Sequence, residues 1–332
     1  MTFRFEPVPE SIVEQMREIN ARFSAAELPD PATAEGLAVM RATTFQVPAP
    51  VELVPVDRVV SGPAGEASVR IFRPAGPVTG VVFHVHGGGF VLGAPADDDA
   101  VNDLLARTAG VAVVSTRYRL APEHPFPAAL DDCLAAAGWL AGAVEEEFGT
   151  DRIVVSGYSA GGHLAVQTLL RLRDKFPELF RKVVGASLVF GVYDLTRTPS
   201  SRSAAPDTPV LPPRWIDQFV GMAFPGLGDE ELRDGAYSPL YADLHGLPPA
   251  LFTVGELDPL LDDSLFMAAR WRAAGGASEL AVWPESPHGF VGMTPPTGLP
   301  AQRRINAWVK ALLLGARQPL DAELGGRAGQ SN

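Results

Sequence analysis

Apolar and polar residues follow one another along the chain in an order that predicts alternating strands and helices from about residue 51 onward. Short apolar runs bounded by glycine or charge are typical of buried strands in a mostly parallel sheet, and they occur at 80–86, 111–117, 152–157, 182–191, 249–255 and 278–284. An earlier pair of strands, joined by a glycine-rich turn, is predicted at 51–60 and 67–74. Helical patterns fill the intervals at 98–108, 127–148, 160–176 and 262–275. This alternation predicts an α/β fold.

Two segments depart from the alternation. Residues 1–50 precede the first strand, and they carry an apolar helical face that includes Val13 and Met16. Residues 194–236 contain an amphipathic stretch at 212–224. An insertion after a strand of an open sheet lies at the strand's carboxyl end, where such sheets bind ligands. We therefore expect residues 194–236 to form part of a cap, with a long surface loop as the alternative, and residues 1–50 to add an extra layer to the core.

The remaining chain is divided accordingly. The core is predicted to consist of residues 51–193 and 237–316, closed by a final helix whose apolar stripe includes Ile305, Trp308 and Val309. The small and polar residues 317–332 are expected to form a flexible tail.

Composition narrows the class of protein. The chain has 332 residues and a net charge of −12, which disfavours nucleic acid as a partner. The N-terminus lacks the pattern of a signal peptide, and no apolar run is long enough to cross a membrane. The single cysteine, Cys133, cannot form an internal disulfide. These features favour a cytoplasmic location.

A candidate nucleophile lies between a predicted strand and the helix that follows it. Ser159 is the centre of a Gly-x-Ser-x-Gly pattern formed by Gly157 and Gly161. This chemistry needs a sharp strand-to-helix turn that lifts the serine off the end of the sheet. The alternative is an ordinary glycine-rich turn, because the pattern alone is weak. The neighbouring helix start favours developing negative charge.

A run of three glycines, Gly87, Gly88 and Gly89, follows the strand predicted at 80–86. Their exposed N–H groups, together with that of Ala160, can bind the oxygen that becomes negative when a carbonyl is attacked. A flexible loop and a phosphate cradle are the alternatives. The acidic stretch at 97–99, with no lysine nearby, disfavours the cradle.

The histidine and the acid should follow the serine along the chain in the order serine, acid, histidine. His288 follows the last predicted strand and is the best candidate for the base. Asp258, just after the strand at 249–255, is the best candidate for the acid, with Glu256 as the runner-up. Asp262 and Asp263 are expected to begin the next helix instead.

Taken together, five segments resemble the hormone-sensitive-lipase-like branch of the α/β-hydrolases, the bacterial carboxylesterases. They are His-Gly-Gly-Gly-Phe at 86–90, the segment 118–132, Gly-Tyr-Ser-Ala-Gly-Gly at 157–162, the segment 237–263 and Pro-His-Gly-Phe at 287–290. The resemblance covers roughly residues 60–315. It implies an eight-stranded α/β-hydrolase sheet, a cap built from the helices of residues 1–50 and the 194–236 insertion, and the Ser159–Asp258–His288 triad. Four residues of the segment 118–132 are interpreted as support for the site, namely Tyr118, Arg119, Glu123 and His124.

One residue departs from the family pattern, since Tyr158 stands where most members have Asp or Thr. Its ring could reshape the pocket or pack as a buried ring under the cap. The aromatic residues expected to line the substrate pocket are Phe90, Tyr158, Trp215, Phe219 and Phe290.

The resemblance implies a serine carboxylesterase that works through an acyl-enzyme and needs no cofactor. The apolar residues of 194–236 suggest an uncharged ester with a short to medium acyl chain, and no residue cluster with metal-ligand spacing is visible in the sequence, so no metal is expected. The expected partner is a small-molecule ester; a lactone or an acetylated natural product stays open. Family members often dimerise through the last strand and helix, so a homodimer is an alternative to a monomer. A receptor without activity is disfavoured because all three triad residues are present. A peptidase or amidase shares the serine machinery, and only matched substrates would separate it.

Overall fold

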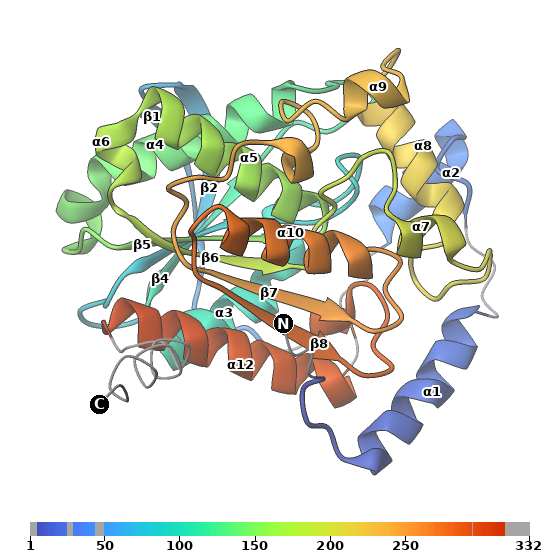
Figure 1. Ribbon diagram of the computed structural model, residues 1–332. Helices are drawn as coiled ribbons and strands as arrows, with labels where there is room; N and C mark the ends of the chain where they lie inside the picture. The colour runs from blue at the N-terminus through green and yellow to red at the C-terminus, as the bar shows by residue number, and fades with distance from the viewer. Residues whose placement is uncertain (1–4, 25–28, 44–49, 294, 316–332) are drawn as a thin grey trace, which may run out of the picture.

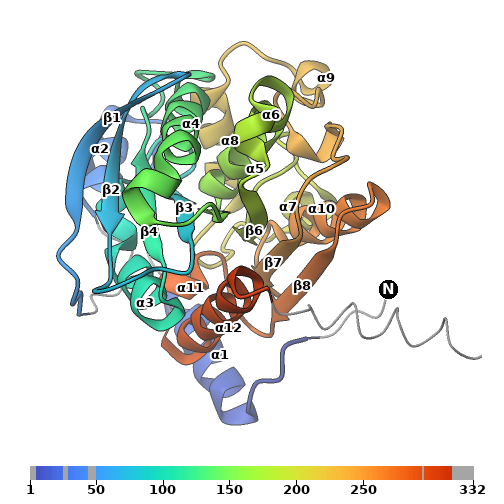
Figure 2. The ribbon, with the colours of Figure 1, turned by 90° about the vertical axis from the view of Figure 1, so that its left-hand side faces the viewer.

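The computed structural model describes residues 5–24, 29–43, 50–293 and 295–315. At its centre is a twisted eight-stranded sheet with the order β1-β2-β4-β3-β5-β6-β7-β8 (Figures 1 and 2). β2 pairs antiparallel with β1 and β4, and the remaining neighbours pair in parallel. The strands are β1 (Val56–Gly62), β2 (Gly65–Phe72), β3 (Val81–Val85), β4 (Ala112–Arg117), β5 (Ile153–Tyr158), β6 (Val183–Val189), β7 (Ala250–Gly255) and β8 (Ser278–Trp283).

Helices cover both faces of the sheet (Figure 2). One face is covered by α4 (Ala128–Phe148), α5 (Ala160–Lys175) and α10 (Leu261–Ala273), with the short α6 (Pro177–Phe180) after α5. The other face is covered by α3 (Asp99–Ala109) and α12 (Pro295–Leu313). The central strands β3 and β5 are therefore buried along their whole length, which explains why they are continuous apolar runs in the sequence.

Glycine ends two of these helices. Gly110 follows α3 and Gly149 follows α4, each in the left-handed conformation with φ near 69° and 70°. Their N–H groups bond the carbonyls of Ala106 and Glu145. Glycine adopts this conformation without steric cost, so each glycine lets the chain turn back into the next strand.

The described chain also contains further helices, most of them short. They are α1 (Glu10–Ser24), α2 (Ala34–Ala42), α7 (Pro199–Ser203), α8 (Pro213–Ala223), α9 (Asp229–Leu232), α11 (Phe290–Met293) and the 3₁₀ turns η1 (Pro95–Asp98) and η2 (Pro239–Tyr241). α8 is hydrogen-bonded to the segment just before α2. The Trp215 indole donates to the Pro29 carbonyl at 3.2 Å, and the Gln218 amide donates to Asp30 at 2.7 Å.

α1 lies apart from this pair, against the loop that follows β8 (Figure 1). Arg17 pairs with the Glu285 carboxylate at 2.8 Å, and the Asn20 amide donates to the Glu285 carbonyl at 2.8 Å. The two N-terminal helices therefore contact different parts of the core.

The strand predicted at 51–60 is wrong in its first half, because β1 begins at Val56. Pro55 has no N–H to donate, and the Leu53 N–H bonds the Asp103 carboxylate at 2.8 Å rather than a strand. The predicted tail at 317–332 lies outside the described residues.

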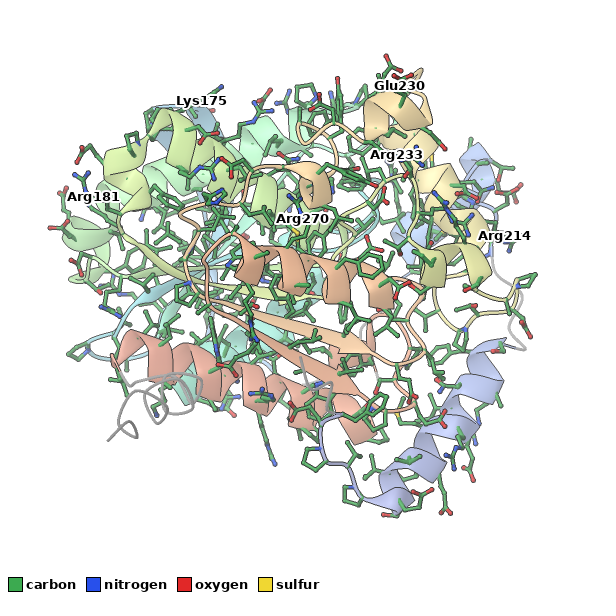
Figure 3. All side chains as sticks on the ribbon, viewed as in Figure 1. Lys175, Arg181, Arg214, Glu230, Arg233 and Arg270 are labelled. Carbon is green, nitrogen blue, oxygen red and sulfur yellow. The ribbon has the colours of Figure 1, made fainter. Side chains whose placement is uncertain are left out.

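Charged side chains such as Lys175, Arg181 and Glu230 project outward from their helices (Figure 3). Among the described helices, none combines the length and the apolar character that crossing a bilayer requires.

Candidate active site

Ser159 lies in the sharp turn between β5 and α5. Its φ of 54° and ψ of −121° are strained for a residue with a side chain. The turn requires two neighbouring glycines. A Cβ at Gly157 would lie 2.1 Å from the Gly161 carbonyl oxygen, and a Cβ at Gly161 would lie 2.1 Å from the Val85 carbonyl oxygen. The strand, the turn and the helix can pack this closely only because both positions lack side chains.

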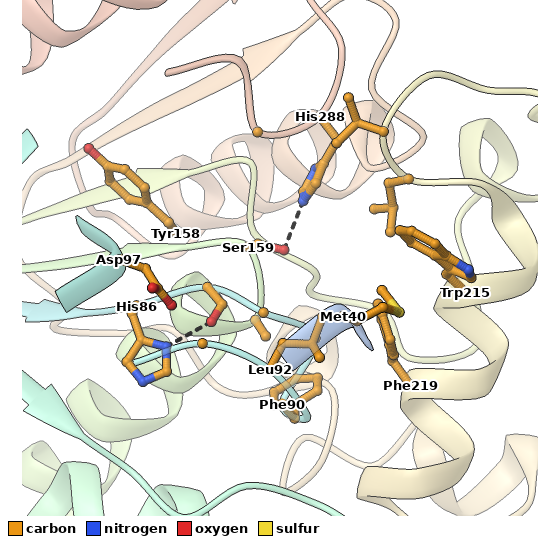
Figure 4. Close-up of a pocket in the computed structure, with 18 of the residues that line it drawn as sticks. Met40, His86, Phe90, Leu92, Asp97, Tyr158, Ser159, Trp215, Phe219 and His288 are labelled. Atoms are coloured by element: carbon orange, nitrogen blue, oxygen red, sulfur yellow. Dashed lines mark hydrogen bonds between the residues drawn. The ribbon is translucent and has the colours of Figure 1, made fainter. Parts of the chain in front are cut away.

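The structure brings Ser159, His288 and Asp258 together. His288 Nε2 lies 2.9 Å from Ser159 Oγ (Figure 4), and His288 Nδ1 lies 2.8 Å from Asp258 Oδ2. Because the carboxylate can only accept, Nδ1 carries the proton, and Nε2 of the neutral ring is left to accept from the serine hydroxyl. The Asp258 side chain is fully buried, and its other oxygen accepts the Leu260 N–H at 2.8 Å. This arrangement can remove a proton from Ser159.

The other acidic candidates have different partners. Glu256 accepts the Glu285 N–H at 3.0 Å and so holds the loop that carries His288. Asp263 lies in the first turn of α10 as predicted, but it is fully buried. It accepts hydrogen bonds from the N–H groups of Tyr193 and Asp194 at 2.6 and 2.9 Å. Burial raises the pKa of Asp263 to about 7.

The glycine loop lies directly beside the nucleophile. A Cβ at Gly87 would be 3.4 Å from Ser159 Cβ. Gly88 and Gly89 have positive φ of 114° and 59°, and the Phe219 ring fills the space that a Cβ at Gly89 would take. The glycine loop and Ala160, the first residue of α5, are therefore both next to Ser159.

Tyr118 braces this loop, as the sequence interpretation of site support requires. Its hydroxyl lies 3.1 Å from the carbonyl oxygens of both His86 and Gly87. Its ring stacks on the His86 imidazole with centroids 4.1 Å apart. Burial lowers the pKa of His86 to about 4, so this imidazole is neutral at physiological pH.

A cavity of about 450 Å³ opens at Ser159 and His288 (Figure 4). Four of the five predicted pocket residues line it, namely Phe90, Tyr158, Trp215 and Phe219. Other apolar side chains in the wall were not identified from the sequence; they include Met40, Leu92, Phe190, Val192, Leu211, Ile216 and Leu260. Phe190 could have been identified from the sequence, because it lies at the end of a predicted strand. Nothing in the local sequence pattern relates Met40 to Ser159.

The prediction for Phe290 is wrong. Its side chain is fully buried in the core beneath the site, and its ring contacts Phe190 and Trp283 at centroid distances of 6.1 and 6.3 Å.

Tyr158 lines the cavity, but its hydroxyl points away from Ser159 (Figure 4). The hydroxyl donates to Gln302 Oε1 on α12 at 2.9 Å. The ring is 6% exposed and packs against the rings of His84 and Phe190, with centroids 4.9 and 5.6 Å away.

The one guanidinium in the cavity wall, among the residues described, is neutralised by a neighbour. Arg41 on α2 forms two hydrogen bonds of 2.8 Å with the Glu123 carboxylate. The arginine lowers the pKa of Glu123 to about 2. Arg41 Nε also donates to the Val91 carbonyl at 3.0 Å, which ties α2 to the end of the glycine loop. The wall near Arg41 therefore suits an uncharged ligand.

Residues 82–292 match the family model described as alpha/beta hydrolase fold. The chain is 38% identical over 277 residues to the carboxylesterase NlhH of Mycobacterium tuberculosis (strain ATCC 25618 / H37Rv), covering 78% of this chain and 83% of that protein. A hyperthermophilic esterase from the archaeon Pyrobaculum calidifontis superposes with a TM-score of 0.73 and 29% identity, over 93% of this chain and 99% of the other. An esterase of the bacterial hormone-sensitive lipase family superposes with a TM-score of 0.76 and 26% identity, over 92% and 100%.

Proposed function

The chain is a carboxylic ester hydrolase of the α/β-hydrolase fold family, similar to an esterase of the bacterial hormone-sensitive lipase family, and on that premise we propose that it cleaves short- to medium-chain esters through a Ser159–His288–Asp258 triad. The observation that carries the proposal is that the serine, the histidine and the aspartate are joined by two consecutive hydrogen bonds beside the cavity. Ser159 Oγ, His288 and Asp258 are joined at 2.9 and 2.8 Å, within the range that proton transfer requires.

In the first half of the reaction, His288 Nε2 takes the proton of Ser159 as Oγ bonds to the ester carbonyl carbon. The carbonyl oxygen becomes an oxyanion. When the tetrahedral intermediate collapses, the C–O bond to the alcohol breaks and the alcohol leaves with the proton from His288. Asp258 accepts the Nδ1–H throughout, so it fixes the ring tautomer and stabilises the charged imidazolium.

In the second half, water replaces the alcohol. His288 takes a proton from the water as its oxygen attacks the acyl carbon, and a second oxyanion forms. Its collapse breaks the bond to Ser159 Oγ, which recovers its proton from His288. The acid is released and the free enzyme is regenerated.

The oxyanion is proposed to bind the N–H of Ala160 and N–H groups from Gly87, Gly88 and Gly89. Ala160 is the first residue of α5, and the first N–H groups of a helix have no partner within the helix. Gly87 supports the assignment because its backbone lies against Ser159. Donors fixed before the reaction stabilise the developing charge without reorganisation.

The substrate is proposed to be a small uncharged ester. The cavity of about 450 Å³ lies in the lower half of the range of small-molecule sites, which is roughly 300–1,000 Å³. Aromatic and aliphatic side chains dominate its wall, and the Arg41 charge is paired with Glu123. A homodimer through β8 and α12 stays a prediction, to be measured by light scattering.

Hydrolysis of p-nitrophenyl esters from acetate to laurate tests the proposal. We expect activity that is greatest on the shorter chains and absent in Ser159→Ala. Ser187→Ala is the matched control, because Ser187 is a fully buried serine on the neighbouring strand β6. A folded Ser159→Ala protein that keeps wild-type turnover would overturn the triad. Equal rates on a matched ester and amide would instead favour an amidase, and greatest activity on laurate would overturn the chain-length assignment.

A further inference from the structure

The glycine loop that carries the proposed oxyanion donors is closed at its base by a buried pair of side chains. His84 lies in β3, two residues before His86, and Asp98 is the last residue of η1. His84 Nε2 lies 2.7 Å from Asp98 Oδ2. The pair therefore joins the strand that enters the loop to the turn that leaves it.

This contact is shielded from water. The His84 and Asp98 side chains are only 2% and 4% exposed. A carboxylate is rarely buried to this extent without a partner, and a hydrogen bond to an ionised group in a low dielectric is stronger than one in water. Removing either side chain would leave its partner buried without this bond.

The loop between the pair is strained and therefore needs to be held. Gly88, Gly89, Phe90 and Gly93 all have positive φ, of 114°, 59°, 68° and 93°. For Phe90 this conformation is unfavourable because the residue has a side chain. Tyr118 and Arg41 hold the middle of the loop through its carbonyl groups, whereas the His84–Asp98 pair holds both ends.

His84 also contacts the strand that carries the nucleophile. Its ring lies perpendicular to the Tyr158 ring at a centroid distance of 4.9 Å, and its Nδ1 is 3.4 Å from Ser156 Oγ. Tyr158 immediately precedes Ser159, and its hydroxyl is fixed by Gln302 at 2.9 Å. One buried imidazole thus contacts both halves of the site: the base of the glycine loop and the end of β5.

We propose that the His84–Asp98 pair, packed against Tyr158, is a positioning device that sets the glycine-loop N–H groups relative to Ser159. The inference rests on the proposed function, because it concerns the oxyanion donors of that reaction. Both side chains are proposed to act through the glycine loop and Tyr158, so they are positioning residues and not catalytic ones.

The test compares four variants: His84→Phe, Asp98→Leu, the double variant His84→Phe/Asp98→Leu, and Asp98→Asn. We expect each single apolar variant to lower kcat on p-nitrophenyl acetate by about tenfold to a hundredfold, less than the roughly 10²–10³-fold loss on removing a donor. KM should change by less than about twofold, because ground-state binding is unaffected. Asp98→Asn keeps an acceptor for His84 and should keep a kcat near wild type.

A ligand pair separates positioning from general damage to the fold. A trifluoromethyl ketone forms an oxyanion adduct with the serine, whereas the methyl ketone of the same chain binds without reacting. In His84→Phe, we expect weaker binding of the first by the same factor as kcat and unchanged binding of the second. Thr168→Val is the control, since it removes a buried hydroxyl bond within α5 and should alter neither inhibitor.

The double variant keeps the proposal falsifiable if a single variant fails to fold. Replacing a whole buried pair by apolar side chains restores much of the stability that one replacement loses. We expect the double variant to have a melting temperature near that of the wild type but a kcat as low as that of the single variants. Wild-type kcat in the double variant would overturn the inference. Failure of the wild type to bind the trifluoromethyl ketone more tightly than the methyl ketone would instead count against the proposed function.

Discussion

The contact between α8 and the glycine loop leads to a prediction that can be worked out in free energy. Gly89 has a φ of 59°, and a Cβ there would lie 2.3 Å from Cδ2 and 2.7 Å from Cγ of Phe219. Phe219 belongs to α8 and is 7% exposed. A methyl group at Gly89 therefore cannot enter unless the ring, and with it α8, moves.

Two terms set the expected cost of Gly89→Ala. The left-handed conformation costs a residue with a Cβ roughly 1–2 kcal/mol. Overpacking against the ring costs about 1–3 kcal/mol more. Phe219→Ala alone should cost about 3–5 kcal/mol through loss of the buried ring. In the double variant the methyl enters the space that the ring leaves, so the overpacking term disappears and the double cost falls below the sum of the single costs by about 1–3 kcal/mol.

Urea unfolding of the wild type, both single variants and the double variant measures this coupling. Gly110→Ala is the matched control, because Gly110 has a similar φ of 69° but nothing lies within 4 Å of the position that a Cβ would take there. It should cost only the conformational term, roughly 1–2 kcal/mol. Strict additivity of the Gly89 and Phe219 substitutions, within about 0.5 kcal/mol, would refute the packing of the ring against the loop.

Three further predictions follow from the positions of single side chains. Asp258→Asn should lower kcat by about 10⁴-fold because the imidazole takes the wrong tautomer. Glu256→Gln changes only a loop contact and should lower kcat by less than about tenfold. A larger loss in Glu256→Gln than in Asp258→Asn, measured by steady-state assays, would make Glu256 the acid of the triad. Burial raises the pKa of Asp263 from 3.8 to about 7, so protonation of this carboxyl stabilises the folded protein. The contribution to the free energy of unfolding is fully present below pH 3.8 and is lost as the pH rises through about 7. Asp263→Asn should remove this part of the dependence of the unfolding free energy on pH. Urea unfolding at successive pH values measures it, and the same pH dependence in the variant and the wild type would contradict the prediction. Phe290→Ala should lower the free energy of unfolding by about 3–5 kcal/mol without changing the preferred acyl-chain length. A preference shifted toward longer chains would show that Phe290 lines the substrate pocket after all.

The sequence by itself was sufficient to predict the order of strands and helices in the core and the strands that the triad candidates follow. β3 and β5 are continuous apolar runs because they are covered on both faces, and this local property is visible without the fold. Ser159, Asp258 and His288 each follow a strand that runs parallel to its neighbours. Parallel strands end at one edge of the sheet, so residues far apart in the sequence meet there.

Only the tertiary structure decided which way several of these side chains face and what they contact. Phe290 and Phe219 are both aromatic residues near predicted site segments, yet one is in the core and the other is in the cavity wall. Asp263 begins its helix as predicted, but its carboxylate holds a loop some 70 residues away in the sequence. Apolar pattern and local propensity tell whether a residue is buried, because both are set by its neighbours in the chain. They do not tell against which partner it is buried, because that depends on how distant segments such as α2 and α8 pack together.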